Sequence, residues 1–101
     1  MGATEAIAAF ITGTSAKDFP PGAREQAKKA IADTFAAILA GAGSEVTEPL
    51  LRYVRSAGES GASPILGTGV TAAPEMAALV NGTFGHALDY DDVLSIMPAH
   101  P

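Results

Sequence analysis

The sequence predicts an all-α fold of about four helices joined by short loops. Two observations carry this prediction. Apolar residues recur at spacings of three and four in four segments, which is the period of a helix with one buried face. Proline and glycine fall at the ends of these segments, where helices begin and stop. No sheet is expected.

The first two helices are predicted at residues 3–12 and 21–41, joined by a connector at 15–20. Gly13 is a candidate stop for the first, and Pro21 suits the first turn of the second. The second has the clearest apolar periodicity, and Gly41 and Gly43 end it. The expected apolar positions of the two helices are Ile7, Phe10, Ile11, Ala27, Ile31, Thr34, Phe35, Ile38 and Leu39.

The third helix is predicted at residues 44–57, with Ser44 as its N-cap and Gly58 as its stop. Residues 58–73 are rich in Gly, Ser, Thr and Ala. A strand at 64–67 is an alternative there, but the flanking glycines favour an extended loop. The fourth helix is predicted from Pro74 to about Leu88, and the tail from residue 89 is expected to be loop. The apolar positions expected in these two helices are Leu50, Leu51, Val54, Met76, Leu79, Val80 and Phe84.

Gly82 and Gly85 lie three residues apart inside the fourth predicted helix. Each costs the helix about 1 kcal/mol relative to alanine. Glycines at this spacing let another helix or a ligand approach the backbone closely.

The composition predicts a thin hydrophobic core. The chain has 101 residues, enough for one small domain, and 48% of them are apolar. Of those apolar residues, 21 are alanines, which add little buried area. We therefore expect a partial helical domain over residues 1–101 that packs against helices outside this chain.

The same numbers exclude several classes of protein. Without cysteine, disulfides, iron–sulfur clusters and thiolate zinc sites are excluded. Six basic residues and a net charge of −5 argue against a nucleic-acid partner. No apolar run approaches the ~20 residues that span a membrane, and the first residues lack the basic region of a secretory signal. A cytoplasmic chain is expected.

Chemistry-bearing residues gather in the last segment. Residues 86–101 hold both histidines, three aspartates and no Lys or Arg. If the fourth helix persists, His86 and Asp89 share a face and can hydrogen-bond. Three interpretations stay open from spacing alone: a solvated helix end, a metal site that does not fit an EF-hand loop, and an acid–base site.

The string NGTFGHALDYDD at 81–92, followed by His100-Pro101, resembles the signature of the MmgE/PrpD family. Residues 30–34 and 39–41 are similar to the family's second helix, and 65–69 and 74–78 to its loop and next helix. The resemblance covers roughly residues 5–100. The family includes 2-methylcitrate dehydratase, cis-aconitate decarboxylase and iminodisuccinate epimerase.

The resemblance implies a large all-α domain with a smaller α+β lid, in a homodimer, of which this chain is the N-terminal part. It implies proton abstraction next to a carboxylate of a small di- or tricarboxylate. The expected enzyme is a 2-methylcitrate dehydratase-like lyase, with decarboxylation or epimerisation as alternatives. It implies no metal and no organic cofactor.

Carried over by motif position, Asp89 and His100 match catalytic residues, and His86 and Asp92 are expected near the substrate. Two departures stand out. Val93 occupies a position where many relatives have threonine, and the gap to His100 is about one residue longer than in some relatives. Both point to a subgroup with its own substrate.

The charge distribution indicates that this segment lacks the cations needed to bind a carboxylate substrate. Residues 56–101 contain no Lys or Arg, yet carboxylate substrates are bound by cations, preferably bidentate Arg. Those cations are expected from outside this chain or from a partner. The alternative from another class is that the 101 residues form a catalytically silent helical interaction module, or do not fold stably alone.

Overall fold

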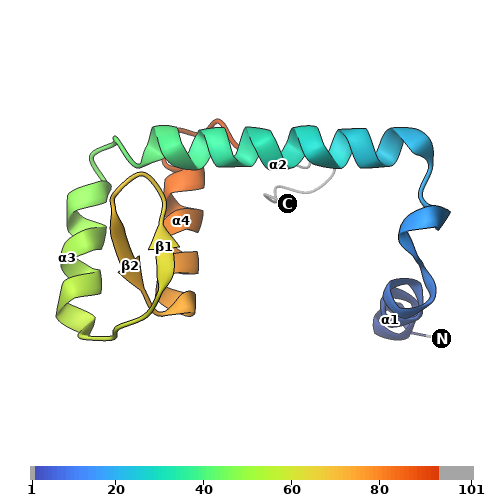
Figure 1. Cartoon of the computed structure of the whole chain (residues 1–101), viewed down its shortest axis with the longest axis horizontal. Helices are drawn as coiled ribbons and strands as arrows, with labels where there is room; N and C mark the ends of the chain where they lie inside the picture. The colour runs from blue at the N-terminus through green and yellow to red at the C-terminus, as the bar shows by residue number, and fades with distance from the viewer. Residues whose placement is uncertain (1, 94–101) are drawn as a thin grey trace.

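The computed structural model describes residues 2–93, and the chain is mostly helical around one long helix (Figure 1). Helix α2 forms a rod, with α1 hanging from its first end and α3, a β-hairpin and α4 gathered at its other end. The elements in chain order are α1 (Ala3–Gly13), the 3-10 turn η1 (Ala16–Asp18), α2 (Pro21–Gly41), α3 (Thr47–Ala57), β1 (Ser63–Ile65), β2 (Val70–Ala72) and α4 (Pro74–His86).

Helices α1 and α2 lie where the sequence predicts them. Pro21 occupies the first helical position of α2, where its missing N–H costs no hydrogen bond. Before it, Ser15 and Asp18 close the turn η1, since Asp18 accepts hydrogen bonds from the backbone N–H and the hydroxyl of Ser15, both at 2.7 Å. Both bonds lower the pKa of Asp18, and the bond from the hydroxyl has the larger effect.

The expectation of a purely all-α chain is wrong at residues 58–73. Strands β1 and β2 pair antiparallel there, with Ser63 opposite Ala72 and Ile65 opposite Val70. Gly67 and Gly69 have φ of 77° and 73°, so the glycines that favoured a loop supply the reversal between strands. Each strand has only three residues, too few to show an alternating pattern.

Helix α3 begins later and α4 ends earlier than predicted. Ser44 is not an N-cap: its hydroxyl donates back to the carbonyl of Gly41 at 2.6 Å, and α3 begins at Thr47. Gly58 does stop α3, with φ of 68°. Helix α4 ends at His86 rather than near Leu88, and this shift decides the geometry of the site.

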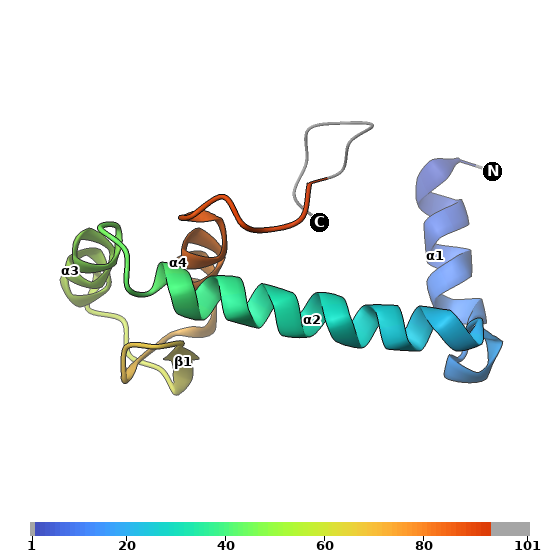
Figure 2. The same cartoon turned by 90° about the horizontal axis from the view of Figure 1, so that it is seen from above.

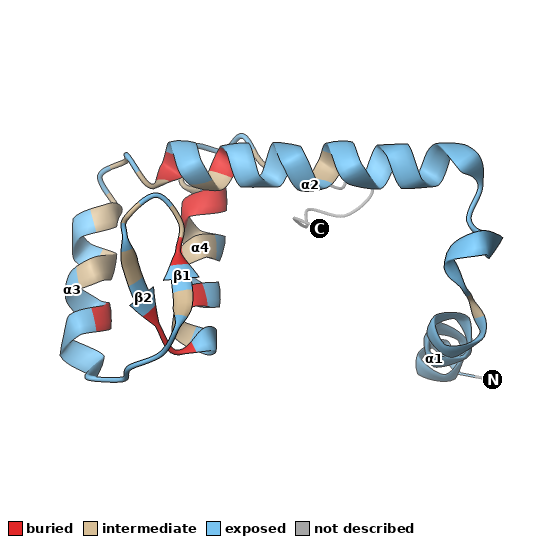
Figure 3. Cartoon of the chain, viewed as in Figure 1, coloured by how far each residue is buried: buried red, intermediate tan, exposed pale blue. Residues whose placement is uncertain are grey.

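The core lies at one end of the molecule, between α2, α3, α4 and the hairpin (Figure 3). Strand β1 and helix α2 both pack on α4. Apart from Phe84, the buried residues of this core are small or β-branched, and partly buried side chains such as Leu50 and Met76 pack against them. The buried cluster consists of Val54, Ile65, Ala72, Ala77, Val80 and Phe84.

Close approach between α2 and α4 occurs at Gly41. A Cβ added to Gly41 would lie 2.7 Å from the carbonyl carbon of Phe84 and 3.0 Å from its Cα. Of the glycine pair inside α4, Gly85 faces another helix, as one of the predicted alternatives has it, and Gly82 does not. A Cβ at Gly85 would meet Ile38 Cγ1 at 3.4 Å, whereas at Gly82 nothing lies within 4 Å. Gly82 therefore borders open space.

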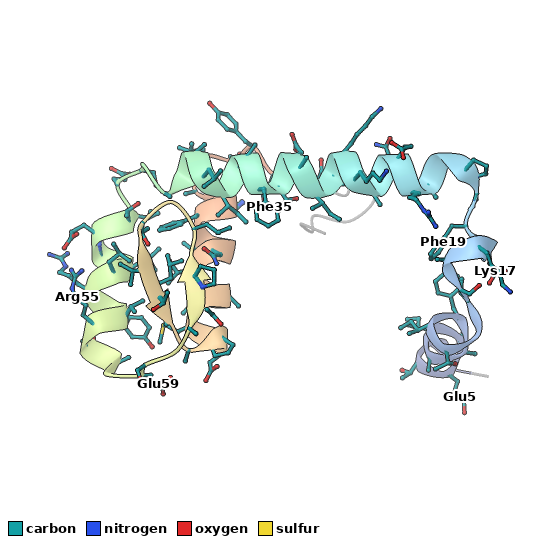
Figure 4. The ribbon with its side chains drawn as sticks, viewed as in Figure 1. Glu5, Lys17, Phe19, Phe35, Arg55 and Glu59 are labelled. Carbon is teal, nitrogen blue, oxygen red and sulfur yellow. The ribbon has the colours of Figure 1, made fainter. Side chains whose placement is uncertain are left out.

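Apolar side chains along α1 and the first half of α2 are exposed. Several of the positions predicted to be buried fall here, and Phe35 projects from α2 on the side from which α1 and α4 also hang (Figure 4). The radius of gyration is 16.8 Å, against about 13 Å for a compact chain of this length. None of the helices within residues 2–93 is both long and apolar enough to cross a membrane. The exposed predicted positions are Ile7, Phe10, Ile11, Ala27, Ile31, Thr34, Phe35, Leu39 and Leu79.

Candidate functional site

The candidate site begins where α4 ends. The backbone N–H of Asp89 donates to the carbonyl of His86 at 2.9 Å and closes the last turn. Asp89 has φ of 57°, a left-handed conformation that Asp adopts more readily than most residues. Beyond the end of α4 the chain reverses and then runs back alongside α2 (Figure 2).

This reversal gives His86 a different partner from the one predicted. Its Nδ1 lies 3.1 Å and 3.2 Å from the two carboxylate oxygens of Asp91, five residues on. The prediction that His86 and Asp89 pair on one helix face is wrong because the helix stops at His86. Spacing within a helix could not reveal Asp91, since the contact depends on the turn at Asp89.

Asp89 nevertheless stays close to this pair. One ligand atom each of His86, Asp89 and Asp91 lie within 4.8 Å of one another. Three such atoms are half of the six or more ligands that Mg²⁺ or Ca²⁺ takes, and two of these residues are exposed. Exposed acidic groups often gather without a cation, so we assign no metal here.

Two hollows flank His86. The larger has a volume of about 840 Å³ and the smaller about 300 Å³. Gly82 and His86 border both. Besides these two, the larger is lined by Val46, Ala78, Leu79, Thr83, Ala87 and Asp89. The smaller is lined by Thr34, Ile38, Asn81, Gly85, Asp91 and Asp92.

The predicted site residues divide over these hollows. Asp89 borders the larger and Asp92 the smaller, while His86 lies between them. Val93, where the family resemblance implied a threonine, is 60% exposed. His100 lies outside the described residues.

The charges around both hollows are acidic. Within the described part of the chain, the titratable residues in the two linings besides His86 are Asp89, Asp91 and Asp92, with no Lys or Arg among them. Two basic side chains elsewhere in this part have other contacts: Lys28 pairs with Glu25, and Arg55 with Glu48 on the far side of α3 (Figure 4). The arrangement suits proton transfer or cation binding better than binding an anion unaided.

Asn81, the first residue of the motif, has a structural contact in this fold. Its side-chain oxygen accepts the backbone N–H of Leu66 at 2.9 Å, and its amide nitrogen donates to the carbonyl of Pro64 at 3.0 Å. The side chain thus ties α4 to the outer edge of β1. This holds the helix that ends in His86 against the hairpin.

Comparison with known protein families supports the family resemblance of the sequence motif. The family model described as the MmgE/PrpD N-terminal domain matches residues 5–101. No curated protein and no solved structure matches the chain at a significant level. The match spans nearly the whole chain, and it includes both the helix that ends in His86 and the acidic segment after it. The chain belongs to the MmgE/PrpD family.

Proposed function

We propose that this chain contributes to an enzyme that abstracts a proton next to a carboxylate of a small di- or tricarboxylate, as a 2-methylcitrate dehydratase-like lyase. The observation that carries the proposal is the gathering of His86, Asp89, Asp91 and Asp92 around two adjoining hollows within the family's motif. An imidazole beside carboxylates is a usual arrangement for general acid–base catalysis, which contributes about 10²–10⁴-fold to rate.

In this proposal Asp89 and His100 are the catalytic pair. One of them acts as the general base or acid, and the other orients that side chain. His86 and Asp92 contact the substrate. Asp89 supports its part by bordering the larger hollow, next to the ring of His86. The role of His100 rests on its position in the motif alone.

The proposal requires cations from elsewhere. The three aspartates that line the two adjoining hollows repel a substrate with two or three carboxylates, at a cost of roughly 1 kcal/mol per close pair even in water. Arg or Lys from a partner subunit or from outside this chain would offset this. A homodimer of the whole protein is consistent with that need.

Decarboxylation and epimerisation remain the alternative outcomes. Epimerisation removes a proton and returns it to the other face of the same carbon, whereas loss of carbon dioxide leaves a carbanion that the acid of the site then protonates. Val93 lacks the hydroxyl that many relatives have at its position. The missing hydrogen bond to a substrate oxygen weighs against dehydration and decarboxylation more than against membership of the family.

The test uses Asp89→Asn and His100→Ala in the whole protein, assayed for dehydration, decarboxylation and epimerisation of tricarboxylate and dicarboxylate substrates. Each variant is expected to lose about 100-fold or more of kcat. Asp33→Asn, the same chemical change on α2 and outside both hollows, is the matched control. Unchanged activity in both site variants contradicts the assignment.

A second candidate is a catalytically silent helical module, favoured by the exposed apolar side chains of α1 and α2. Light scattering of the 101-residue chain and a titration with citrate or aconitate separate the two. Self-association without tricarboxylate binding favours the module. Turnover of a tricarboxylate by a monomer excludes it.

A further inference from the structure

We propose that Asp91 is a positioning residue that holds His86 as its Nδ1–H tautomer, so that Nε2 is the ring nitrogen able to accept a proton. This assigns Asp91 a role that the motif comparison did not, and it turns His86 from a substrate contact into a candidate base. Its consequence for activity rests on the proposed function, but the tautomer itself does not.

The hydrogen-bond geometry sets the tautomer. Nδ1 of His86 lies 3.1 Å from Oδ1 and 3.2 Å from Oδ2 of Asp91. An ionised carboxylate has only acceptor atoms, so the proton between the two groups must be on Nδ1. In a neutral imidazole the other nitrogen, Nε2, then carries the lone pair. The hydrogen bond of one ring nitrogen thus determines the chemistry of the other.

The difference in burial indicates that Asp91 is the fixed side chain of the pair and that it holds the ring of His86. The side chain of Asp91 is 18% exposed, whereas that of His86 is 57% exposed. The carboxylate lies against the smaller hollow, where α2 contributes the uncharged Thr34 and Ile38. A partly buried carboxylate is screened less by water than one on the open surface, so its hold on the ring is stronger. His86 also lines the larger hollow.

The backbone of Asp89 makes this contact possible. Its left-handed φ of 57° and its hydrogen bond to the carbonyl of His86 turn the chain back toward α4. Among residues 2–93, the charged groups that share the two linings with His86 are Asp89, Asp91 and Asp92, since α2 and the segment before α3 contribute uncharged residues. Of these three, Asp91 is the one whose oxygens lie within hydrogen-bond distance of Nδ1.

The test is a direct observation of the tautomer in the 101-residue chain. With ¹⁵N-labelled histidine, two-bond ¹H–¹⁵N spectra at about pH 8.5, about two units above an ordinary imidazole pKa, distinguish the two nitrogens. The signals of His86 are assigned by their absence in His86→Gln. The Nδ1–H form is expected to dominate in the unchanged chain and to give way to Nε2–H, the form favoured in water, in Asp91→Ala.

Asp92→Ala is the matched control, because it removes a neighbouring carboxylate and keeps the His86–Asp91 contact; its tautomer is expected to be unchanged. Folding of each variant is checked by circular dichroism. If Asp91→Ala does not fold, the isosteric Asp91→Asn replaces it, since an amide that can also donate weakens the preference for Nδ1–H. An unchanged tautomer in the folded Asp91 variant overturns the proposal.

Activity of the whole protein provides the second readout. Asp91→Ala is expected to lower kcat by about 10- to 100-fold and to change KM less, because a base in the wrong tautomer still lies in place. If the tautomer changes in Asp91→Ala but Asp89→Asn and His100→Ala keep full activity, the positioning role of Asp91 is supported and the proposed function is refuted. An unchanged tautomer refutes the positioning role whatever the activity.

Discussion

Replacing Gly41 with alanine is the sharpest test of the packing that supports the site. Gly41 is the last residue of α2, and it lies against the backbone of Phe84 in α4. An added Cβ would clash most severely with the carbonyl oxygen of Phe84, and it would lie 2.7 Å from the carbonyl carbon and 3.0 Å from the Cα of that residue. Non-bonded atoms pack best at about 3.5–4.0 Å, so the two helices must move apart by more than about 1 Å.

The expected cost is the balance of two effects. Overpacking against a backbone that cannot rotate away costs about 2–3 kcal/mol. Alanine in a helix recovers up to about 1 kcal/mol relative to glycine. The net loss of about 1–2 kcal/mol lowers the Tm of a chain this size by about 5–15 °C. Because Phe84 is the one aromatic ring in the buried cluster of the described residues, the loss is shared by the whole core.

Urea and thermal unfolding, followed by circular dichroism, measure this difference. Gly82→Ala is the matched control, since Gly82 also lies in a helix but has nothing within 4 Å of an added Cβ. That variant is expected to gain up to about 1 kcal/mol. A Gly41→Ala chain as stable as the unchanged one, or a Gly82→Ala chain that loses stability, refutes the reasoning.

Three further predictions concern single contacts. Asn81→Ala removes two hydrogen bonds and leaves the part-buried N–H of Leu66 without its acceptor, so the free energy of unfolding in urea is expected to fall by about 1–3 kcal/mol. Ser15→Ala removes the hydroxyl that most lowers the pKa of Asp18, so an NMR titration is expected to show that pKa moving up toward its ordinary value. In the unchanged chain, the lowered pKa of Asp18 stabilises the fold at pH values above the pKa of this group in the unfolded chain, and this stabilisation is lost as the pH falls. The variant is therefore also expected to lose less stability on acidification. An unmoved pKa contradicts this. Asp89→Ala is expected to cost about 1 kcal/mol more in urea than Asp89→Asn, which tolerates the left-handed backbone; equal losses contradict a conformational role.

The helices were predictable because their signals are local. Pro21 and Gly41 mark the two ends of α2 in the sequence and in the structure. The hairpin was not predictable in the same way, since its strands are short and glycine surrounds them. It exists because Ile65 is buried against α4 and because Asn81 ties the backbone of β1 to that helix, and both contacts join residues far apart in the chain.

In the candidate site too, some features follow from the residue order and others arise only in the folded chain. Residue order alone establishes the family, the two histidines and the acidic segment, because a motif is a property of the sequence. The pairing of His86 with Asp91 rather than Asp89 arises only in the folded chain, since it depends on where α4 ends and on one left-handed residue. The folded chain also makes Gly82 border a hollow while Gly41 carries the helix contact, because the approach of two helices is set by the core between them.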